Sequence, residues 1–335
     1  MIVVTGANGL VGSYLCRWLL QQGKQVRGMR RADSNMRLVE DIASQIEWVI
    51  GDVTDVVAIE NAMSGVDQVY HCAAVISYRK KSAAQMMRIN GEGTANMVNI
   101  ALDLGIKKFV HISSIAALGR TGKDGEIITE EAPWDMKYIT TDYAISKFTA
   151  EREVWRAMAE GLKAVIINPS IILGAGDWEN GSSKLFSTIY KGFKFYTTGI
   201  TGYVDVRDVV RIAQVAMDSD ITEQRFIVNG DNWTNKDVLQ HMARSLHVKE
   251  PSVHAGKTLS EIAWRMEWLK GLFSGKEPAV TKQTARIANA TTYFNSNKMK
   301  DTFHYSCVPL EKTIADTAAA FLAEKTDGKF HPLEF

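Results

Sequence analysis

The chain is short of cysteine and has no cluster of residues at metal-ligand spacing. Its 335 residues include three cysteines, Cys16, Cys72 and Cys307, which lie far apart in the sequence. This usage suits a reducing compartment. The seven histidines make no His-Glu-x-x-His or similar pattern. We therefore expect no metal site and a cytoplasmic protein.

The chain also lacks an excess of charge of one sign and any long apolar run. Its net charge is +1, so bulk electrostatics give no reason to expect nucleic acid as a partner. No apolar stretch is long enough to cross a bilayer, and the N-terminus enters a predicted strand without a signal peptide. We therefore expect no membrane partner. The last five residues, 331–335, are expected to form a loose end.

What the chain does have is a glycine-rich turn at its start. Residues 1–5 are apolar and β-branched, as in a buried parallel strand. Glycines follow at three-residue spacing, and residues 10–22 have the pattern of an amphipathic helix. A strand, a tight glycine turn and a helix form the context of a dinucleotide-binding fingerprint, in which the helix N-terminus faces the phosphates. The residues expected to contact the dinucleotide are Gly6, Asn8, Gly9, Leu10, Val11 and Gly12.

A tyrosine and a lysine four residues apart form the second motif. In the run Tyr143-Ala-Ile-Ser-Lys147, both side chains share one face of a helix predicted over residues 141–159. A free phenol titrates near pH ~10, and a neighbouring ammonium favours the phenolate. The pair is therefore interpreted as a proton-transfer device, because it lies downstream of the glycine turn.

Strand and helix patterns alternate through the first half of the chain. Repeated βαβ units of this kind predict an α/β protein with a Rossmann-type doubly wound parallel sheet. After Pro169 the pattern loosens, and we expect a smaller, mostly helical C-terminal substrate lobe. The predicted domains are 1–169, which binds NAD(P), and 170–330, which binds substrate, with 204–230 returning to the sheet. The predicted strands are 1–5, 25–29, 46–50, 68–73, 108–112, 163–168 and 225–228, and the predicted helices are 10–22, 56–63, 84–104, 141–159 and 207–217.

With both motifs in place, the chain resembles the extended short-chain dehydrogenase/reductase superfamily, the NAD(P)-dependent epimerases and dehydratases, over nearly its whole length. Within it, the blocks around Ser114 and Pro169 are most similar to the dihydroflavonol-4-reductase-like branch. The blocks that match in the expected order are Gly51–Val53, Val69–Ala74, Asn90–Thr94, Phe109–Ala117, Asn168–Gly174 and Tyr203–Asp208.

The resemblance implies a catalytic set of serine, tyrosine and lysine. Ser114 matches the family serine best, although the sequence alone barely separates it from Ser113. The serine hydroxyl would bond a substrate carbonyl or alkoxide, and Tyr143 would donate or remove the proton. Lys147 would lower the pKa of Tyr143 and hold the nicotinamide ribose. Hydride would move directly between the nicotinamide and the substrate carbon.

The resemblance also implies an NAD(P) site, whose preference depends on the end of the second strand. NAD enzymes usually place an acidic residue there, whereas this chain has Arg30 and Arg31. Guanidinium groups suit the 2′-phosphate of NADP, and the alternative is two solvated surface arginines. Asn90 would anchor a relay water or make a structural bond. The other expected cofactor contacts are Asp52 and Val53 at the adenine, Ala73 and Ala74 at the nicotinamide, and Tyr143, Lys147, Pro169 and Ser170.

The sequence says less about the substrate pocket than about the cofactor site. His71 is interpreted as a packed or hydrogen-bonded strand residue rather than a catalyst. Trp264 belongs to an apolar stripe at helical spacing, and such a stripe packs in a core more often than it lines a ligand site. The expected substrate contacts are Tyr78, Ser114, Trp178 and Tyr203, with Arg79 beside the pocket.

Three functions are compatible with these residues. The first is an NADP-dependent reductase of a ketone or aldehyde. The second is a nucleotide-sugar epimerase or dehydratase, which often has a basic residue before the block at Tyr203, where residues 199–202 carry none. The third is a non-catalytic NADP-sensing protein, which commonly loses the tyrosine or lysine. A homodimer through helices 84–104 and 141–159 is a family expectation.

Overall fold

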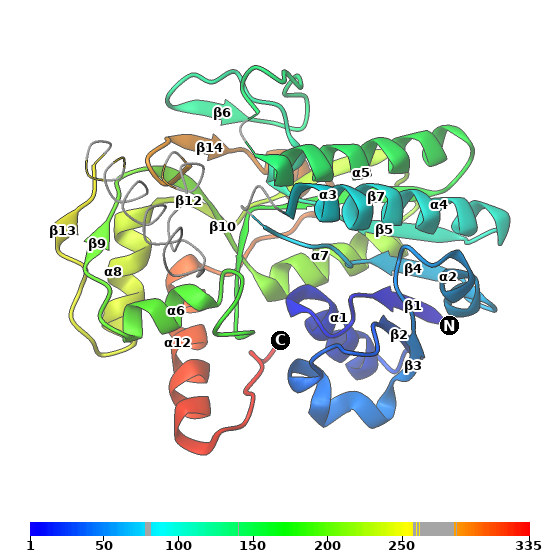
Figure 1. Cartoon of the computed structure of the whole chain (residues 1–335), viewed down its shortest axis with the longest axis horizontal. Coiled ribbons are helices and arrows are strands. Elements are labelled where there is room, and N and C mark those ends of the chain that lie inside the picture. The colour runs from blue at the N-terminus through cyan, green and yellow to red at the C-terminus, as the bar shows by residue number, and fades with distance from the viewer. Residues whose placement is uncertain (78–81, 140, 257–258, 260, 262–284, 286) are drawn as a thin grey trace.

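A parallel β-sheet forms the centre of the computed structural model, which describes residues 1–335 apart from 78–81, 140, 257–258, 260, 262–284 and 286 (Figure 1). The sheet has the strand order β11-β7-β5-β4-β1-β2-β3, and each neighbouring pair is parallel. The order reverses between β1 and β4, as in a doubly wound fold, so the predicted Rossmann-type sheet is confirmed. The strands are β1 (Ile2–Thr5), β2 (Val26–Arg30), β3 (Glu47–Ile50), β4 (Gln68–His71), β5 (Lys108–Ile112), β7 (Ala164–Pro169) and β11 (Gln224–Val228).

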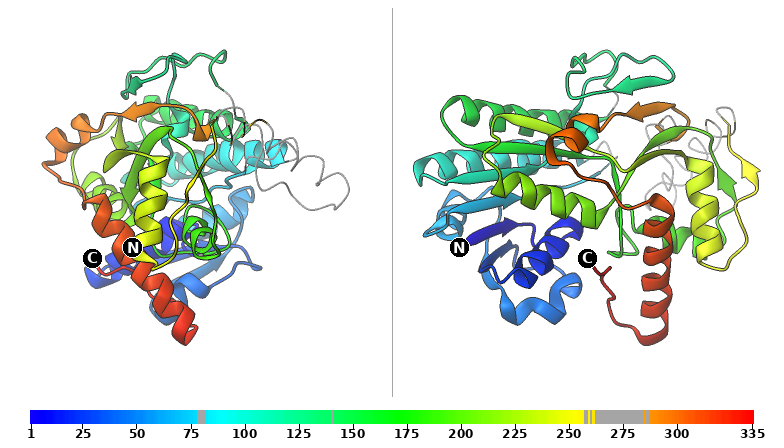
Figure 2. Two further views of the ribbon diagram at one scale, coloured as in Figure 1. Left: turned by 90° about the vertical axis from the view of Figure 1, so that its left-hand side faces the viewer. Right: turned by 180° about the vertical axis from the view of Figure 1, so that it is seen from behind.

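Helices cover both faces of this sheet (Figures 1 and 2). One face carries α1 (Leu10–Gln21) and α7 (Val206–Asp218), and the other carries α2 (Val56–Met63), α4 (Gly93–Asp103) and α5 (Asp142–Ala159). Because successive strand residues point to opposite faces, a strand buried on both sides must be apolar throughout. This is why the uninterrupted apolar run at the start of the chain forms β1.

A smaller lobe lies beside the carboxyl ends of the strands (Figure 1). It contains the expected helices, but also short sheets with the orders β12-β10-β8, β13-β9 and β14-β6. Their strands are two to six residues long, too short for alternation to indicate them. The elements are β6 (Glu126–Ile128), β8 (Ile171–Leu173), β9 (Phe195–Tyr196), β10 (Ile200–Asp205), β12 (Asp231–Thr234), β13 (Val253–His254), β14 (Thr292–Phe294), α6 (Lys184–Tyr190), α8 (Asn235–Ser245), α11 (Asn297–Phe303) and α12 (Leu310–Asp327). None of the described helices has the length and apolar character that a membrane crossing needs.

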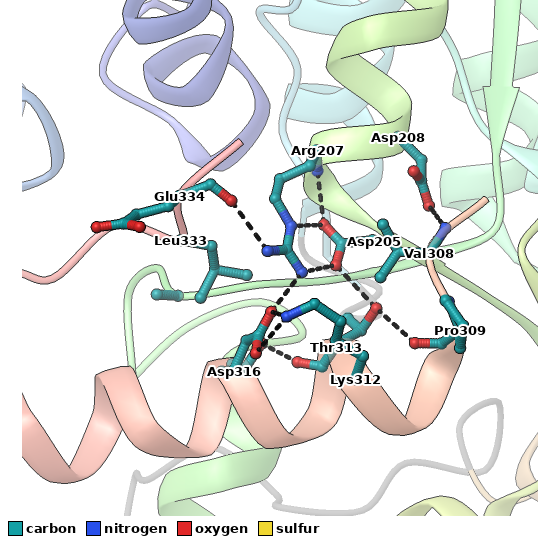
Figure 3. Close-up of polar contacts among 12 residues, drawn as sticks. Asp205, Arg207, Asp208, Val308, Pro309, Lys312, Thr313, Asp316, Leu333 and Glu334 are labelled. Carbon is teal, nitrogen blue, oxygen red and sulfur yellow. Dashed lines mark hydrogen bonds and ion pairs between the residues drawn. The ribbon is translucent and has the colours of Figure 1, made fainter. Parts of the chain in front are cut away.

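A buried ion cluster joins β10 and α7 to α12 (Figure 3). The Arg207 guanidinium donates to both carboxylate oxygens of Asp205, at 2.9 and 2.6 Å, and lies 2.9 Å from Asp316 Oδ2. It also donates to the carbonyl oxygen of Glu334 at 3.0 Å. The Thr313 hydroxyl adds a 2.8 Å bond to Asp205. Because a buried charge without its partner is costly, the cluster holds α12 firmly against α7.

The C-terminal tail is packed against α1, so the expectation of a loose end is wrong. Leu333 is buried, and its backbone N–H donates to the Tyr14 hydroxyl at 2.9 Å. The Phe335 ring lies beside the Trp18 ring, with centroids 4.7 Å apart. The tail has too few apolar residues to form a pattern, and their partners lie at the opposite end of the chain. No pattern within the tail therefore predicts this contact.

Replacing Leu333 by alanine tests whether the tail contributes to stability. Loss of a buried leucine side chain should lower the free energy of unfolding by at least about 2 kcal/mol. The control is Ile127→Ala, since the Ile127 side chain is 67% exposed and its loss should change stability by less than about 0.5 kcal/mol. Urea unfolding measures both, and equal small effects would show that the tail is not docked in solution.

Candidate active site

The glycine turn lies at the switch point between β1 and β4. Gly6 has a φ of +61°, a left-handed conformation that favours glycine, and a β carbon there would lie 2.9 Å from the Ala73 Cα. A β carbon on Gly12 would overlap the Gly6 carbonyl oxygen. Gly9 begins α1 without any side-chain cap among the described residues, so the first N–H groups of the helix remain available. These features fit a dinucleotide pyrophosphate.

The remaining residues of the predicted phosphate cradle lie around the same turn. Leu10 and Val11 form the first turn of α1 and are half-buried. The Asn8 side-chain amide donates to the Asn35 carbonyl oxygen at 3.1 Å. That bond ties the glycine turn to the segment that follows β2, where the adenosine end of a dinucleotide would lie.

Two arginines mark the end of β2. Arg30 lies over the Trp48 ring, 5.7 Å from its centroid, and its Nη1 donates to the Arg31 carbonyl oxygen at 3.0 Å. The Arg31 side chain is exposed, with Nε 3.4 Å from Asp33 Oδ1. No acidic residue ends the strand. Both arginines are at the edge where the 2′-phosphate of NADP would lie, and neither is held in a buried ion pair.

Asp52 and Val53 follow β3. The Asp52 carboxylate accepts from the Thr54 backbone N–H at 2.9 Å and from its hydroxyl at 2.8 Å. Val53 is buried beneath Gly93 of α4, where a β carbon would lie 2.5 Å from Val53 Cγ2. The expected adenine contacts therefore border the same end of the sheet as the arginines.

The loop after β4 borders the opposite side of the cradle, where the nicotinamide is expected. Thr5 Oγ1 accepts from the Cys72 and Ala73 backbone N–H groups, both at 3.1 Å, while Ala74 is exposed. His71 lies between the hydroxyls of Thr5 (2.8 Å) and Thr94 (3.0 Å), which confirms its interpretation as a hydrogen-bonded strand residue. Burial lowers the pKa of His71 to about 3, so this imidazole is neutral at physiological pH.

Asn90 makes structural bonds. It lies on a π-helical turn, η3 (Met87–Glu92), which links the short α3 (Ala83–Met86) to α4. Its amide exchanges two bonds with the Val75 backbone, accepting at 2.8 Å and donating at 2.9 Å, and donates to the Ser146 hydroxyl at 2.9 Å. Asn90 therefore connects the nicotinamide-side loop to the helix that carries the Tyr-Lys pair. The predicted unbroken helix over 84–104 contains this turn.

The Tyr-Lys pair lies at the start of α5. Thr141 caps this helix by accepting from the Ala144 backbone N–H at 3.0 Å, and Tyr143 and Lys147 follow within its first two turns. Both side chains are buried, with 6% and 3% of their surfaces exposed. The Lys147 ammonium donates to the Ile112 carbonyl oxygen at 3.0 Å. Burial lowers the pKa of Lys147 to about 8, against an opposing effect of Glu151.

The two serines after β5 differ in their surroundings. The Ser113 hydroxyl is buried and donates to Glu151 Oε1 at 2.6 Å. Ser114 is half-buried, and its Oγ accepts from the Ala116 backbone N–H at 3.1 Å, capping η4 (Ile115–Ala117). No acceptor for the Ser114 hydroxyl proton lies within bonding distance in the described part of the chain. The geometry therefore favours Ser114 over Ser113 as a substrate contact.

Among the described residues, the structure does not bring the expected substrate contacts together at one place. Tyr78, Arg79 and Trp264 lie outside the described residues. Trp178 packs edge-on against Phe321, with centroids 5.0 Å apart, and its Nε1 donates to Glu324 Oε2 at 2.7 Å. This packing places Trp178 in the core beside α12, and its pocket role stays a prediction that the packing does not favour.

Pro169 and Ser170 lie at the end of β7, and Tyr203 lies within β10. The Tyr203 ring is buried, and its hydroxyl donates to Asn235 Oδ1 at 2.7 Å. Pro169 is the last residue of β7, and among the described residues the buried Ser170 hydroxyl has only a long contact, 3.4 Å, with the Val228 carbonyl oxygen. Ser170 is thus better placed than Tyr203 to offer its hydroxyl to a ligand.

Sequence reasoning missed the residues behind the pair. Glu151, Asn168 and Arg225 form a buried polar group beneath α5. The available signal was the spacing of Tyr143, Lys147 and Glu151, since residues at i, i+4 and i+8 share one helix face. The partners on the sheet have no such signal, because their proximity depends on the strand order.

A glycine cradle at the switch point and a buried Tyr-Lys pair define an NAD(P)-dependent oxidoreductase of the extended short-chain dehydrogenase/reductase type. The chain belongs to the NAD dependent epimerase/dehydratase family, whose sequence model matches residues 2–229. Sterol demethylase protein B of Methylococcus capsulatus is 32% identical over 71% of this chain and 72% of its own length. A Synechocystis protein provisionally named dihydroflavonol 4-reductase is 28% identical over 95% and 93%. The crystal structure of gox2253 is 28% identical, with a TM-score of 0.82 and 99% coverage of both chains.

Replacing Lys147 by methionine tests the Tyr-Lys pair. The apparent pKa that governs oxidation of an alcohol substrate should rise, because the Tyr143 phenolate loses its nearby cation. Cofactor binding should also weaken. Lys163→Met is the control, since Lys163 is exposed just beyond α5. An unshifted pH–rate profile with full activity in Lys147→Met would make the pair a coincidence of spacing.

Proposed function

We propose that this enzyme is an NADP-dependent reductase of a ketone or aldehyde, which also oxidises the corresponding alcohol. The Ser114 hydroxyl bonds the carbonyl oxygen and Tyr143 gives that oxygen its proton. Lys147 holds the nicotinamide ribose and favours the tyrosinate after proton transfer. The nicotinamide, when bound, supplies the hydride.

The observation that carries this proposal is the burial of the Lys147 ammonium one helical turn after Tyr143. Burial lowers its pKa to about 8, which still leaves the ammonium mostly charged at pH 7, so a cation lies one helical turn from Tyr143 and favours its phenolate. Strongly perturbed ionisable groups beside a ligand cradle are typical of reaction sites. The half-buried Ser114, at the carboxyl end of the neighbouring strand β5, adds a hydroxyl donor to the same region.

The approach to β10 argues against a sugar nucleotide as substrate. The Ile200 backbone N–H donates to the Ala290 carbonyl oxygen at 3.0 Å. A β carbon on Gly199 would lie 2.5 Å from the Ala288 carbonyl oxygen and 2.7 Å from that of Ala290. Carbonyl oxygens repel phosphate groups, and residues 199–202 carry no basic side chain. A diphosphate would find no compensation for its charge at this segment.

A panel of carbonyl compounds tests the proposed reaction. Purified enzyme with NADPH is offered aliphatic and aromatic aldehydes, a ketosteroid, a dihydroflavonol, cinnamoyl-CoA and UDP-glucose, and NADPH loss is followed by absorbance. We expect turnover of at least one carbonyl, and Tyr143→Phe should lower it by at least ~100-fold, the effect of losing a positioned acid. Conversion of UDP-glucose without net NADPH loss would favour an epimerase instead.

Replacing Arg30 and Arg31 together by alanine tests the cofactor preference. Binding of NADPH should weaken much more than binding of NADH, since each charge-assisted bond to the 2′-phosphate contributes roughly 1.5–3 kcal/mol. Lys24→Ala is the control, because Lys24 is exposed at the opposite end of β2. Equal losses for the two cofactors, measured by quenching of protein fluorescence, would contradict NADP preference.

The proposed assembly is a homodimer through the outer faces of α4 and α5, following the family expectation.

A further inference from the structure

A buried polar layer lies between α5 and the sheet, and Glu151 is at its centre. Tyr143, Lys147 and Glu151 follow one another at four-residue spacing on α5, which lies over the sheet (Figure 1), and Lys147 and Glu151 bond to β5 and β7 respectively. The Glu151 side chain is 1% exposed. A carboxyl group so placed, without partners, would favour its neutral form.

Three donors from three neighbouring strands converge on this carboxyl group. The Ser113 hydroxyl, just after β5, and the Asn168 amide of β7 both donate to Oε1, the first at 2.6 Å. Arg225 of β11 donates to Oε2 at 3.3 Å. Because an ionised carboxylate is an acceptor only, donors on both oxygens select the charged form, although burial raises the pKa of Glu151.

The same contacts reach the backbone at Ser114. The Asn168 amide that bonds Glu151 also donates to the Ser114 carbonyl oxygen at 2.9 Å. Two residues earlier, the Ile112 carbonyl oxygen accepts from the Lys147 ammonium at 3.0 Å. The segment at the end of β5 that carries Ser114 is thus connected to α5 twice. Asn168 links the Ser114 carbonyl oxygen to Glu151, and Lys147 bonds the Ile112 carbonyl oxygen directly.

Glu151 also supplies negative charge to the surroundings of Lys147. The other titratable groups around this ammonium are Tyr143 on α5, His71 on β4, Cys72 directly after β4, and His111 on β5. Burial lowers the pKa values of both histidines and raises that of the Cys72 thiol to about 12. These three groups are therefore neutral at pH 7, and the cationic Arg225 donates to the Glu151 carboxylate.

We propose that Glu151 is a positioning residue of the reaction site, which fixes the backbone at Ser114 through Asn168 and keeps the buried Lys147 ammonium charged. It touches neither the reacting atoms nor the expected position of the cofactor. Its effect on turnover rests on the reductase function proposed above. Its effect on the charge of Lys147 does not, and can be measured without any substrate.

The test is a pH titration of Lys147 by NMR in protein with ¹³C-labelled lysine. The Cε resonance of Lys147 is assigned by its absence from Lys147→Met. Its midpoint should fall by about one pH unit or more in Glu151→Gln, which is isosteric but uncharged. Glu153→Gln, which neutralises a half-buried carboxylate two residues away that is paired with Arg156, should leave the midpoint unchanged. An unchanged midpoint in folded Glu151→Gln would overturn the proposal.

A reciprocal measurement covers the case in which Glu151→Gln does not fold. Coupling between two ionisable groups acts equally on both, so Lys147→Met should raise the midpoint of the Glu151 carboxyl carbon, followed with ¹³C-labelled glutamate. No rise would also overturn the proposal.

The effect on turnover separates this proposal from the proposed function. With a carbonyl that the panel identifies, Glu151→Gln should lower kcat at least tenfold and change the KM for NADPH less than twofold. The alkaline limb of reduction should move to lower pH, because Lys147 loses its proton earlier. A stability loss with an unmoved limb would reduce Glu151 to a packing role. If the wild type reduces no carbonyl at all, the reductase function fails, and the lysine titration still decides the role of Glu151.

Discussion

One constraint shapes the candidate active site: the charged Lys147 side chain is buried between α5 and the sheet. Transfer of an ammonium from water into a protein interior costs several kcal/mol even after relaxation. The chain offsets this cost with a backbone carbonyl from the end of β5 and a carboxylate on the next turn of α5. That carboxylate must itself be satisfied, and its donors come from β5, β7 and β11. The sheet makes this possible, because β5, β7 and β11 are neighbouring parallel strands.

The parts of this arrangement that follow from local pattern could be predicted from the sequence. The apolar run at β1, the glycine spacing and the four-residue separation of Tyr143 and Lys147 each depend on neighbours within one element. Glu151 shares that helical period, but its importance depends on Asn168 and Arg225, which belong to other strands. Strand order brings them together, and strand order is set by the packing of the whole sheet. The docking of the C-terminal tail on α1 could not be predicted either, because the tail and its partners lie at opposite ends of the chain.

Aromatic residues show a second limit of prediction from sequence. Trp178 lies within the predicted loop 174–183, which is rich in glycine, serine, asparagine and aspartate, a setting that indicates a pocket border. Its ring instead packs on Phe321 of α12, and its N–H donates to Glu324. Glu324 also accepts from Arg37, which lies on the 3₁₀ segment η1 (Arg37–Gln45) after β2, and Arg37 donates to the Gly176 carbonyl oxygen at 2.6 Å. An aromatic side chain in a loop is therefore informative only once the helix that covers it is known.

These contacts also link the two parts of the molecule. Arg37 on η1, after β2, bonds to Glu324 of α12, while Arg207 and the tail connect α12 to α7 and α1. The smaller lobe is thus tied to the sheet at both ends of α12 by charged or hydrogen-bonded groups. Buried networks of this kind have few alternative arrangements, because each partner that moves leaves another unsatisfied. The framework can therefore hold Tyr143 and Lys147 at fixed positions, while loops beyond strand ends are the parts of a protein that vary most and usually carry its binding residues.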